Sequence, residues 1–316
     1  MTDYTFLKAE GEDGLAGGSA YIASLVTALR AAGHHVDVTA ATGPAPGQVH
    51  VIDGLTLRHV DAGVAAGAVG LVHHVAALTE HASKAAVRET ERANLVLMRR
   101  VIATNHAAAA DLVALGLDAT RVLTILPGVS DAVQRVATTT CPCEILTIGA
   151  LVPRKGHDVL ISALTRLFDL DWHLTIVGDM RRDPATTAAL RELADAVSGR
   201  VMFAGLLDPA AIEAAWQRTD VFALATRWEG YAASVAEALR RGIPVAVTAG
   251  GDAASNVTPQ VGIVCEPGDV VQLSKALRRM IYDTALRAEM ADAAWQAGQK
   301  FPNWAQQALR FAQAVA

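Results

Sequence analysis

The 316-residue sequence is poor in aromatic residues, which make up 5%, and in charged residues, which make up 19%. Ordinary soluble domains carry about 25% charged residues. Hydrophobic residues make up 52% of the chain, and alanine and valine are prominent among them. This composition excludes a disordered chain and is typical of a globular protein with large apolar cores. The length predicts two domains of ordinary size.

The sequence also lacks a basic surplus, a signal peptide and a long unbroken apolar run. Its formal net charge of -5 disfavours nucleic acid as the main partner. The opening letters MTDYTFLKAE contain neither a basic n-region nor an apolar h-region, so we expect no signal peptide. The longest mostly apolar window, about residues 60–78, contains Asp61, His73, His74 and several glycines and is a poor membrane span. We expect a cytoplasmic protein with at most peripheral contact at the inner membrane face.

Cysteine is scarce as well, with Cys141 and Cys143 in the triplet CPC and Cys265 alone. An odd number of cysteines without a secretion signal is typical of a reducing compartment. No second pair of Cys or His has a spacing that would complete a metal site with CPC. We therefore interpret CPC as part of a linker.

Strands of Val, Ile and Leu alternate with Ala-rich helical segments along nearly the whole chain. This alternation is typical of βα units on parallel sheets that are buried on both faces. In residues 17–38 one helical face carries apolar side chains, and Gly33 is placed to end the helix. The fold class predicted is α/β, with two doubly wound domains whose ligand-binding loops follow the strands.

A polar, Thr-rich segment at residues 130–143 interrupts this alternation, and we place the domain linker there. The predicted domains are residues 1–137 and 138–300, with a C-terminal helix over 301–316 that packs back toward the N-terminal domain. In the second half the pattern predicts helices over 157–167, 184–197, 209–218 and 232–241.

Two loops have residues suited to a phosphate. Gly17-Gly18-Ser19 opens the first clear helix, where free N–H groups favour an anion, although a plain turn with Ser19 as N-cap fits equally well. Arg154 and Lys155 follow a predicted strand and suit a diphosphate, with a solvated basic pair as the alternative. Glycines also recur where later strands end, at Gly178 and Gly205. The dinucleotide fingerprint G-x-G-x-x-G is missing, which disfavours an NAD-dependent enzyme.

Two glutamates flank the start of the helix predicted over 232–241. Glu229 follows a strand, and Glu237 lies five residues into the helix, about 7.5 Å along its axis at a rise of about 1.5 Å per residue. The helix N-terminus between them favours an anion. A sugar, a diphosphate and a ribose have this order, and carboxylates accept hydrogen bonds from neighbouring hydroxyls. Because Glu237 lies among small apolar residues, we expect it to have a polar partner.

Taken together, these segments resemble the retaining glycosyltransferases of glycosyltransferase family 4, which have the GT-B fold. EGYAASVAEALRRGIPVAVT is similar to the family's E-x7-E region, and IGALVPRKGHDVLISAL with LTIVGD is similar to its donor-domain opening. LAGGSAYIASLVTALRAAGHHVDV resembles its Gly-Gly loop and helix, and LVHHVAALTEH resembles a short bacterial subgroup. The resemblance covers most of the chain. It implies two Rossmann-like domains that face a central cleft, an acceptor-side N-terminal one and a donor-binding C-terminal one.

The resemblance also implies roles for individual residues. Arg154 and Lys155 would hold the diphosphate, Glu229 the donor-sugar hydroxyls, and His74, or else His73, would face the donor sugar. Arg154, Lys155, Glu229 and His74 form the implied catalytic set. The implied donor-binding set is Gly17, Gly18, Gly178, Asp179, Leu206, Gly230, Tyr231, Ala232, Ala233 and Glu237, with Glu237 on the ribose.

The implied reaction moves a hexosyl group from a UDP-sugar or GDP-sugar to an acceptor that is a small molecule, a glycan or a lipid-linked compound. Charge develops on the leaving diphosphate, so fixed cations there provide the main catalytic effect. We expect no cofactor and no essential metal, because the fold usually needs none and no D-x-D motif stands at a strand end.

The sequence departs from the family pattern at Ala232, where E-G-[FY]-G usually has a second glycine. A Cβ at this helix mouth could narrow access to the donor. The alternative hypothesis is therefore a catalytically degenerate GT-B protein that binds a sugar nucleotide or a partner without turnover.

Overall fold

The computed structural model describes residues 2–7, 16–39, 48–73, 85–135, 142–197 and 199–316. The chain forms two compact units. Unit 1 comprises residues 1–128 with 302–316, and unit 2 comprises residues 129–301. The predicted domain boundary follows residue 137, whereas the structure divides the chain after Gly128.

Unit 1 is built on a six-stranded parallel sheet in the order β2-β1-β3-β4-β5-β6. The strands are β1 (Asp3–Leu7), β2 (His35–Thr39), β3 (Val49–Asp53), β4 (Val69–Val72), β5 (Arg100–Ala103) and β6 (Val122–Thr124). The helices among its described residues are α1 (Ala16–Ala31), α2 (Ala62–Ala65), α4 (Ala85–Leu97), α5 (His106–Ala114) and α12 (Trp304–Val315), with 3-10 turns η1 (Leu57–His59) and η2 (Ala119–Arg121).

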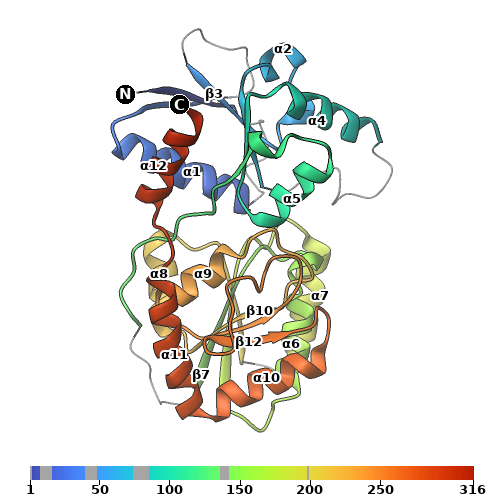
Figure 1. Ribbon diagram of the computed structural model, residues 1–316. Coiled ribbons are helices and arrows are strands. Elements are labelled where there is room, and N and C mark those ends of the chain that lie inside the picture. The colour runs from blue at the N-terminus through green and yellow to red at the C-terminus, as the bar shows by residue number, and fades with distance from the viewer. Residues whose placement is uncertain (1, 8–15, 40–47, 74–84, 136–141, 198) are drawn as a thin grey trace. The chain divides into compact units, whose positions relative to one another are not determined.

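The strands of unit 1 have apolar residues on both faces, so helices cover both. One face packs against α1 and α12 in a core that includes Phe6, Leu25 and Phe311. The other packs against α4 and α5 through residues such as Leu95 and Leu112. The C-terminal helix α12 thus completes the core of unit 1 beside α1 (Figure 1). Gly33 ends α1 with a positive φ of 88°, as its position predicted.

Unit 2 has a second six-stranded parallel sheet, in the order β12-β11-β10-β7-β8-β9. Its strands are β7 (Cys143–Ile148), β8 (Trp172–Val177), β9 (Val201–Gly205), β10 (Val221–Leu224), β11 (Val245–Thr248) and β12 (Gly262–Cys265). Its helices are α6 (His157–Thr165), α7 (Pro184–Asp195), α8 (Pro209–Arg218), α9 (Ala233–Arg240), α10 (Val270–Tyr282) and α11 (Thr284–Gly298), with η3 (Pro153–Lys155) before α6.

Side chains along the central strand β10 alternate between two apolar cores. Val221 and Ala223 join the core under α6, α7 and α10, and Phe222 and Leu224 join the core under α8, α9 and α11. Figure 1 shows these two helical layers on opposite faces of the sheet. The α/β class with two parallel sheets is therefore confirmed. The interpretation of CPC as linker is wrong for Cys143, which begins β7 and is buried, while Cys141 lies outside the described residues.

Candidate functional site

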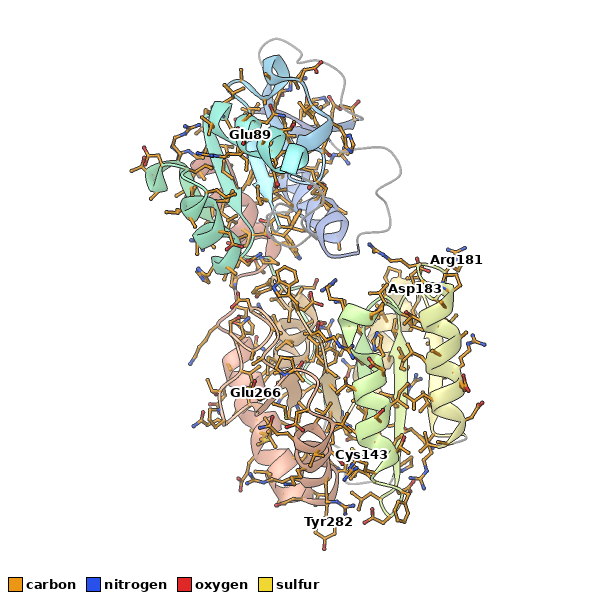
Figure 2. All side chains as sticks on the ribbon, turned by 90° about the vertical axis from the view of Figure 1, so that its right-hand side faces the viewer. Glu89, Cys143, Arg181, Asp183, Glu266 and Tyr282 are labelled. Carbon is orange, nitrogen blue, oxygen red and sulfur yellow. The ribbon has the colours of Figure 1, made fainter. Side chains whose placement is uncertain are left out.

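The strand order of unit 2 places its switch of direction between β7 and β10. These two strands are neighbours, and the sheet then continues to β8 and β9 on one side and to β11 and β12 on the other. The loops that follow β7 and β10 leave toward opposite faces, which opens a crevice beyond the carboxyl ends of the strands. Figure 2 shows the two ends of the sheet, with Cys143 at the start of β7 at one end and Arg181 and Asp183, which follow β8, at the other.

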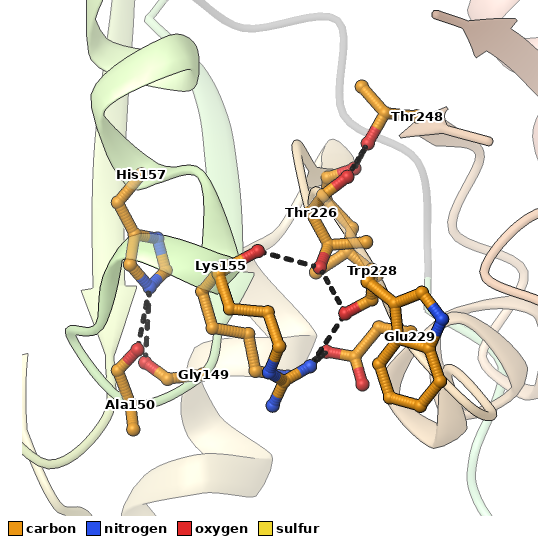
Figure 3. Close-up of polar contacts among 10 residues, drawn as sticks. Gly149, Ala150, Lys155, His157, Thr226, Trp228, Glu229 and Thr248 are labelled. Carbon is orange, nitrogen blue, oxygen red and sulfur yellow. Dashed lines mark hydrogen bonds and ion pairs between the residues drawn. The ribbon is translucent and has the colours of Figure 1, made fainter. Parts of the chain in front are cut away.

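The residues predicted to be catalytic in this unit meet at that switch point. Lys155, from the loop after β7, forms an ion pair with Glu229 Oε1, from the loop after β10 (Figure 3). Arg154 Nη1 lies 3.2 Å from the same oxygen and donates to the carbonyl of Trp228 at 2.6 Å. The Arg154 side chain is 45% exposed, whereas those of Lys155 and Glu229 are 17% and 11% exposed. Lys155 is therefore the enclosed cation and Arg154 the outer one.

Glu229 is also held firmly by its backbone. Its N–H donates to Gly250 O at 3.0 Å, and its carbonyl accepts from Asp252 N at 2.8 Å, so that it forms a parallel bridge with Gly251. A buried carboxylate is costly unless it is paired. The two cations meet this need at Oε1, and a carboxylate with about four lone-pair sites can still accept hydrogen bonds from hydroxyls.

His157, the first residue of α6, holds the loop that carries the two cations. Its Nε2 lies 3.2 Å from Gly149 O and 3.3 Å from Ala150 O, so Nε2 carries the proton and donates (Figure 3). Burial lowers the pKa of His157 from 6.5 to about 4. The ring is therefore neutral at pH 7, and it fixes the start of the loop without adding charge.

Two glycines allow the backbone to approach closely at this edge. A Cβ on Gly156, which has a φ of +64°, would lie 1.9 Å from Ala225 O. A Cβ on Gly178 would lie 1.9 Å from Gly149 O. The loops after β7, β8 and β10 are thus packed backbone against backbone, which leaves no room for a side chain. Asp179 follows Gly178 and accepts from Arg181 N at 2.9 Å.

Ala232 is the N-cap of α9 and is 5% exposed. Its methyl group belongs to the apolar core with Val235 and Leu239. Its φ of -87° is open to any residue, so the backbone here does not require glycine. The Cβ of Ala232 is covered by the unit's own core, whereas an effect of this residue on access to the donor stays a prediction. Beside it, burial raises the pKa of Tyr231 to about 12.

Glu237 has the polar partner that its apolar surroundings predicted. Its Oε2 accepts from Arg241 Nη1, and its Oε1 accepts from Ser130 N at 3.2 Å. Its side chain is 23% exposed. Arg241 in turn pairs with Glu213 on α8 at 2.7 Å. Of the two glutamates of the E-x7-E pattern, Glu229 is therefore paired with Lys155 and Arg154, and Glu237 shares Arg241 with Glu213.

The remaining predicted donor residues of unit 2 lie on loops, or at the start of a helix, at the same edge. Leu206 directly follows β9 and is 68% exposed. Gly230 is half-buried in the loop before α9, and Ala233 is the exposed first residue of that helix.

Unit 1 contains the other residues predicted to bind or face the donor, which are Gly17, Gly18 and one of His73 and His74. Gly17 and Gly18 lie in the first turn of α1, which begins at Ala16, so Ser19 is inside the helix and the N-cap alternative is wrong. A Cβ on Gly18 would lie 2.9 Å from the His73 ring. His73 Nδ1 lies 3.2 Å from Thr104 Oγ1. His74 lies outside the described residues.

Several residues that contribute to the site were not predicted from the sequence. Trp228 places its carbonyl on Arg154, and Thr226 Oγ1 lies 3.1 Å from Arg154 O and 3.0 Å from Trp228 O. Thr248, at the end of β11, donates to Thr226 O at 2.5 Å. These contacts join segments that are far apart in the sequence. The sequence signals these residues only by their position, because each of them ends a strand or follows one.

The described residues contain neither of two other classes of feature, a metal centre and a membrane span. Within that part of the chain, no group of three or more His, Cys, Asp or Glu is arranged to hold a metal ion. No helix in the same residues is long and apolar enough to cross a membrane. A cavity of about 190 Å³ lies in unit 1, lined by Gln48, His50 and Arg99 among others, and none of the predicted site residues lines it.

Comparison with known proteins decides the family. The family described as Glycosyl transferases group 1 matches residues 135–297, which is more than half of the chain and nearly all of unit 2. The chain belongs to this glycosyltransferase family. Lys155, Glu229 and Glu237 all lie within the matched residues.

Curated relatives match about half of this group 1 glycosyltransferase. The chain is 36% identical over 152 residues to a GDP-mannose-dependent monoacylated alpha-(1-6)-phosphatidylinositol monomannoside mannosyltransferase of Corynebacterium glutamicum, covering 45% of this chain and 39% of the relative. It is 31% identical over 160 residues to glycogen synthase of Mycobacterium tuberculosis, covering 50% and 38%. The matches thus span about two fifths of the length of these relatives.

Solved structures match the whole chain. Sucrose-phosphate synthase from Thermosynechococcus elongatus has a TM-score of 0.79 at 20% identity, covering 99% of this chain and 98% of that one. Anabaena Alr3699/HepE, in complex with UDP-glucose, has a TM-score of 0.84 at 18% identity, covering 100% and 99%. These likenesses show that the glycosyltransferase has the GT-B fold, with two Rossmann-like domains.

Proposed function

We propose that this chain is a retaining glycosyltransferase that moves a hexosyl group from a nucleotide-diphosphate sugar to an acceptor. The proposal rests on one observation: Lys155 and Arg154 both form ion pairs with Glu229 at the switch point of unit 2. This arrangement places two cations and one carboxylate where doubly wound sheets bind ligands. Their charges sum to +1 before a ligand arrives, which suits a diphosphate next to sugar hydroxyls.

In this proposal Lys155 and Arg154 stabilise the negative charge that develops on the leaving diphosphate. An ammonium has three donors, so Lys155 can keep Glu229 and also bind a phosphate oxygen. Glu229, fixed by its backbone bridge to Gly251, accepts hydrogen bonds from the donor sugar. Because these groups are already in place, little reorganisation is needed as charge develops. No metal is required for this chemistry.

Glu237 takes the ribose hydroxyls in the same proposal. It lies on the second turn of α9, whose N-terminus favours an anion, and two hydrogen bonds already orient its carboxylate. Retention of configuration is included because the E-x7-E pattern resembles that of retaining enzymes. It is tested by the anomeric configuration of the first product in an NMR time course.

The donor is best sought among GDP-mannose and UDP-glucose, because one relative is named for the first and one similar structure contains the second. Calorimetric titration of the full chain with UDP, GDP and these two sugars is the direct test. We expect Lys155→Ala and Glu237→Ala to weaken nucleotide binding, and Lys155→Ala to lower turnover by roughly 10²–10³.

Arg278→Ala is a suitable control, because it breaks an exposed ion pair with Asp169, before β8 at the opposite edge of the sheet. Unchanged nucleotide affinity in both Lys155→Ala and Glu237→Ala would rule out the site assignment. Tight binding by the wild type without transfer or hydrolysis of any donor would instead favour a protein without turnover.

A further inference from the structure

Arg241, which directly follows α9, is a buried cation with one fixed orientation. Its side chain is 6% exposed. Nε and Nη2 donate to Glu213 Oε2 at 3.2 and 2.7 Å, and Nη1 donates both to the carboxylate of Glu237 and to its backbone oxygen at 3.0 Å. The guanidinium also lies over the Trp216 ring, 5.3 Å from its centroid. A planar group held at its face and on three nitrogens cannot turn.

The groups that hold Arg241 come from another helix. Glu213 and Trp216 both belong to α8, and Trp216 is buried against Phe222 of β10 with ring centroids 5.3 Å apart. The position of Arg241 is therefore set by α8 and the central strand. Through Arg241, these elements also set where the Glu237 carboxylate lies.

Glu237 depends on this support. Fixing a glutamate side chain on a helix costs conformational entropy. Here Arg241 holds Oε2 of Glu237, and the Ser130 N–H holds Oε1. Arg241 also separates the like charges of Glu213 and Glu237, which would otherwise repel across the gap between α8 and α9. We infer that Arg241 is a positioning residue, which holds the Glu237 carboxylate in the orientation that accepts the ribose hydroxyls of the donor. This inference rests on the proposed function.

A purely structural role, in which Arg241 only ties α8 to α9, predicts something different. In that case the loss of Arg241 would lower the affinity of unit 2 for all its ligands by the same factor. If Arg241 acts through Glu237, the loss of Arg241 reduces the preference for a nucleotide whose ribose carries the 2′- and 3′-hydroxyls. The preference for UDP or GDP over the 2′,3′-dideoxy form of the same nucleotide therefore separates the two roles.

The experiment measures this preference by calorimetry in the wild type, Arg241→Met, Glu237→Gln and the double variant. We expect Arg241→Met to reduce the preference roughly tenfold and to add no further loss once Glu237 is changed. Arg241→Lys keeps the charge without the fork and should show an intermediate preference, which also provides a variant if Arg241→Met folds poorly. Arg240→Met is the matched control, because Arg240 is the neighbouring buried arginine and donates instead to Phe301 O at 2.7 Å.

The outcomes are distinct. A full ribose preference in Arg241→Met would overturn the inference while the proposed function stands. An equal loss of affinity for a nucleotide and for its 2′,3′-dideoxy form would assign Arg241 a structural role only. That result would also overturn the inference. If the wild type binds neither UDP nor GDP, the proposed function fails and the inference fails with it.

Discussion

Replacing Lys155 by methionine should destabilise unit 2, because it leaves Glu229 with only the outer cation. Methionine keeps most of the apolar stem, which packs over Gly149, and removes the charge. Breaking a fully buried ion pair costs about 3–5 kcal/mol. Here Arg154 still lies 3.2 Å from Glu229 Oε1 and the pair retains some exposure, so we expect a lower cost of roughly 2 kcal/mol.

A double-mutant cycle tests this cause directly. In Glu229→Gln the buried charge is gone, so adding Lys155→Met should cost clearly less than it does in the wild type, with a coupling of about 1–2 kcal/mol. Urea unfolding followed by tryptophan fluorescence suits the purpose, since four of the five tryptophans, at 172, 216, 228 and 295, lie in unit 2. Additive effects of the two changes would refute the view that Lys155 compensates the charge of Glu229.

Three further predictions concern the frame of the site. His157 is buried with a pKa lowered from 6.5 to about 4, so the unfolded chain takes up its proton first as the pH falls. Stability is therefore lost between about pH 6.5 and 4, by roughly 3 kcal/mol, and the stability gap between wild type and His157→Leu should narrow across this window in urea titrations; a constant gap would contradict it. Gly178→Ala should destabilise by more than about 2 kcal/mol because its Cβ meets a backbone oxygen, whereas Gly63→Ala, with nothing within 4 Å, should be tolerated in thermal melts. Ala232→Gly should cost about 1–2 kcal/mol through its lost methyl and added backbone freedom and should leave nucleotide affinity unchanged; a large gain in affinity would show that the methyl does obstruct the donor.

Helix positions followed closely from the sequence where their signals are local. The pattern predicted a helix over 209–218, and α8 spans Pro209–Arg218, with Asp208 accepting from Ala211 N as its N-cap. Capping residues, an N-terminal proline and apolar spacing act within a few residues of one another, so they can be read along the chain. Strand β3 was not predicted, because Val49–Asp53 includes a histidine and an aspartate and has a weak apolar pattern.

The sequence by itself determined which residue types follow the strands, and so which residues could act: Arg154, Lys155, Glu229 and Glu237. Only the tertiary structure decided how they are paired. Lys155 and Glu229 are 74 residues apart and meet because β7 and β10 are neighbours in the sheet. Glu237 and Glu213 share Arg241 because α8 packs beside α9. Strand order and helix packing depend on how both apolar cores close at once, and spacing along one chain does not specify this.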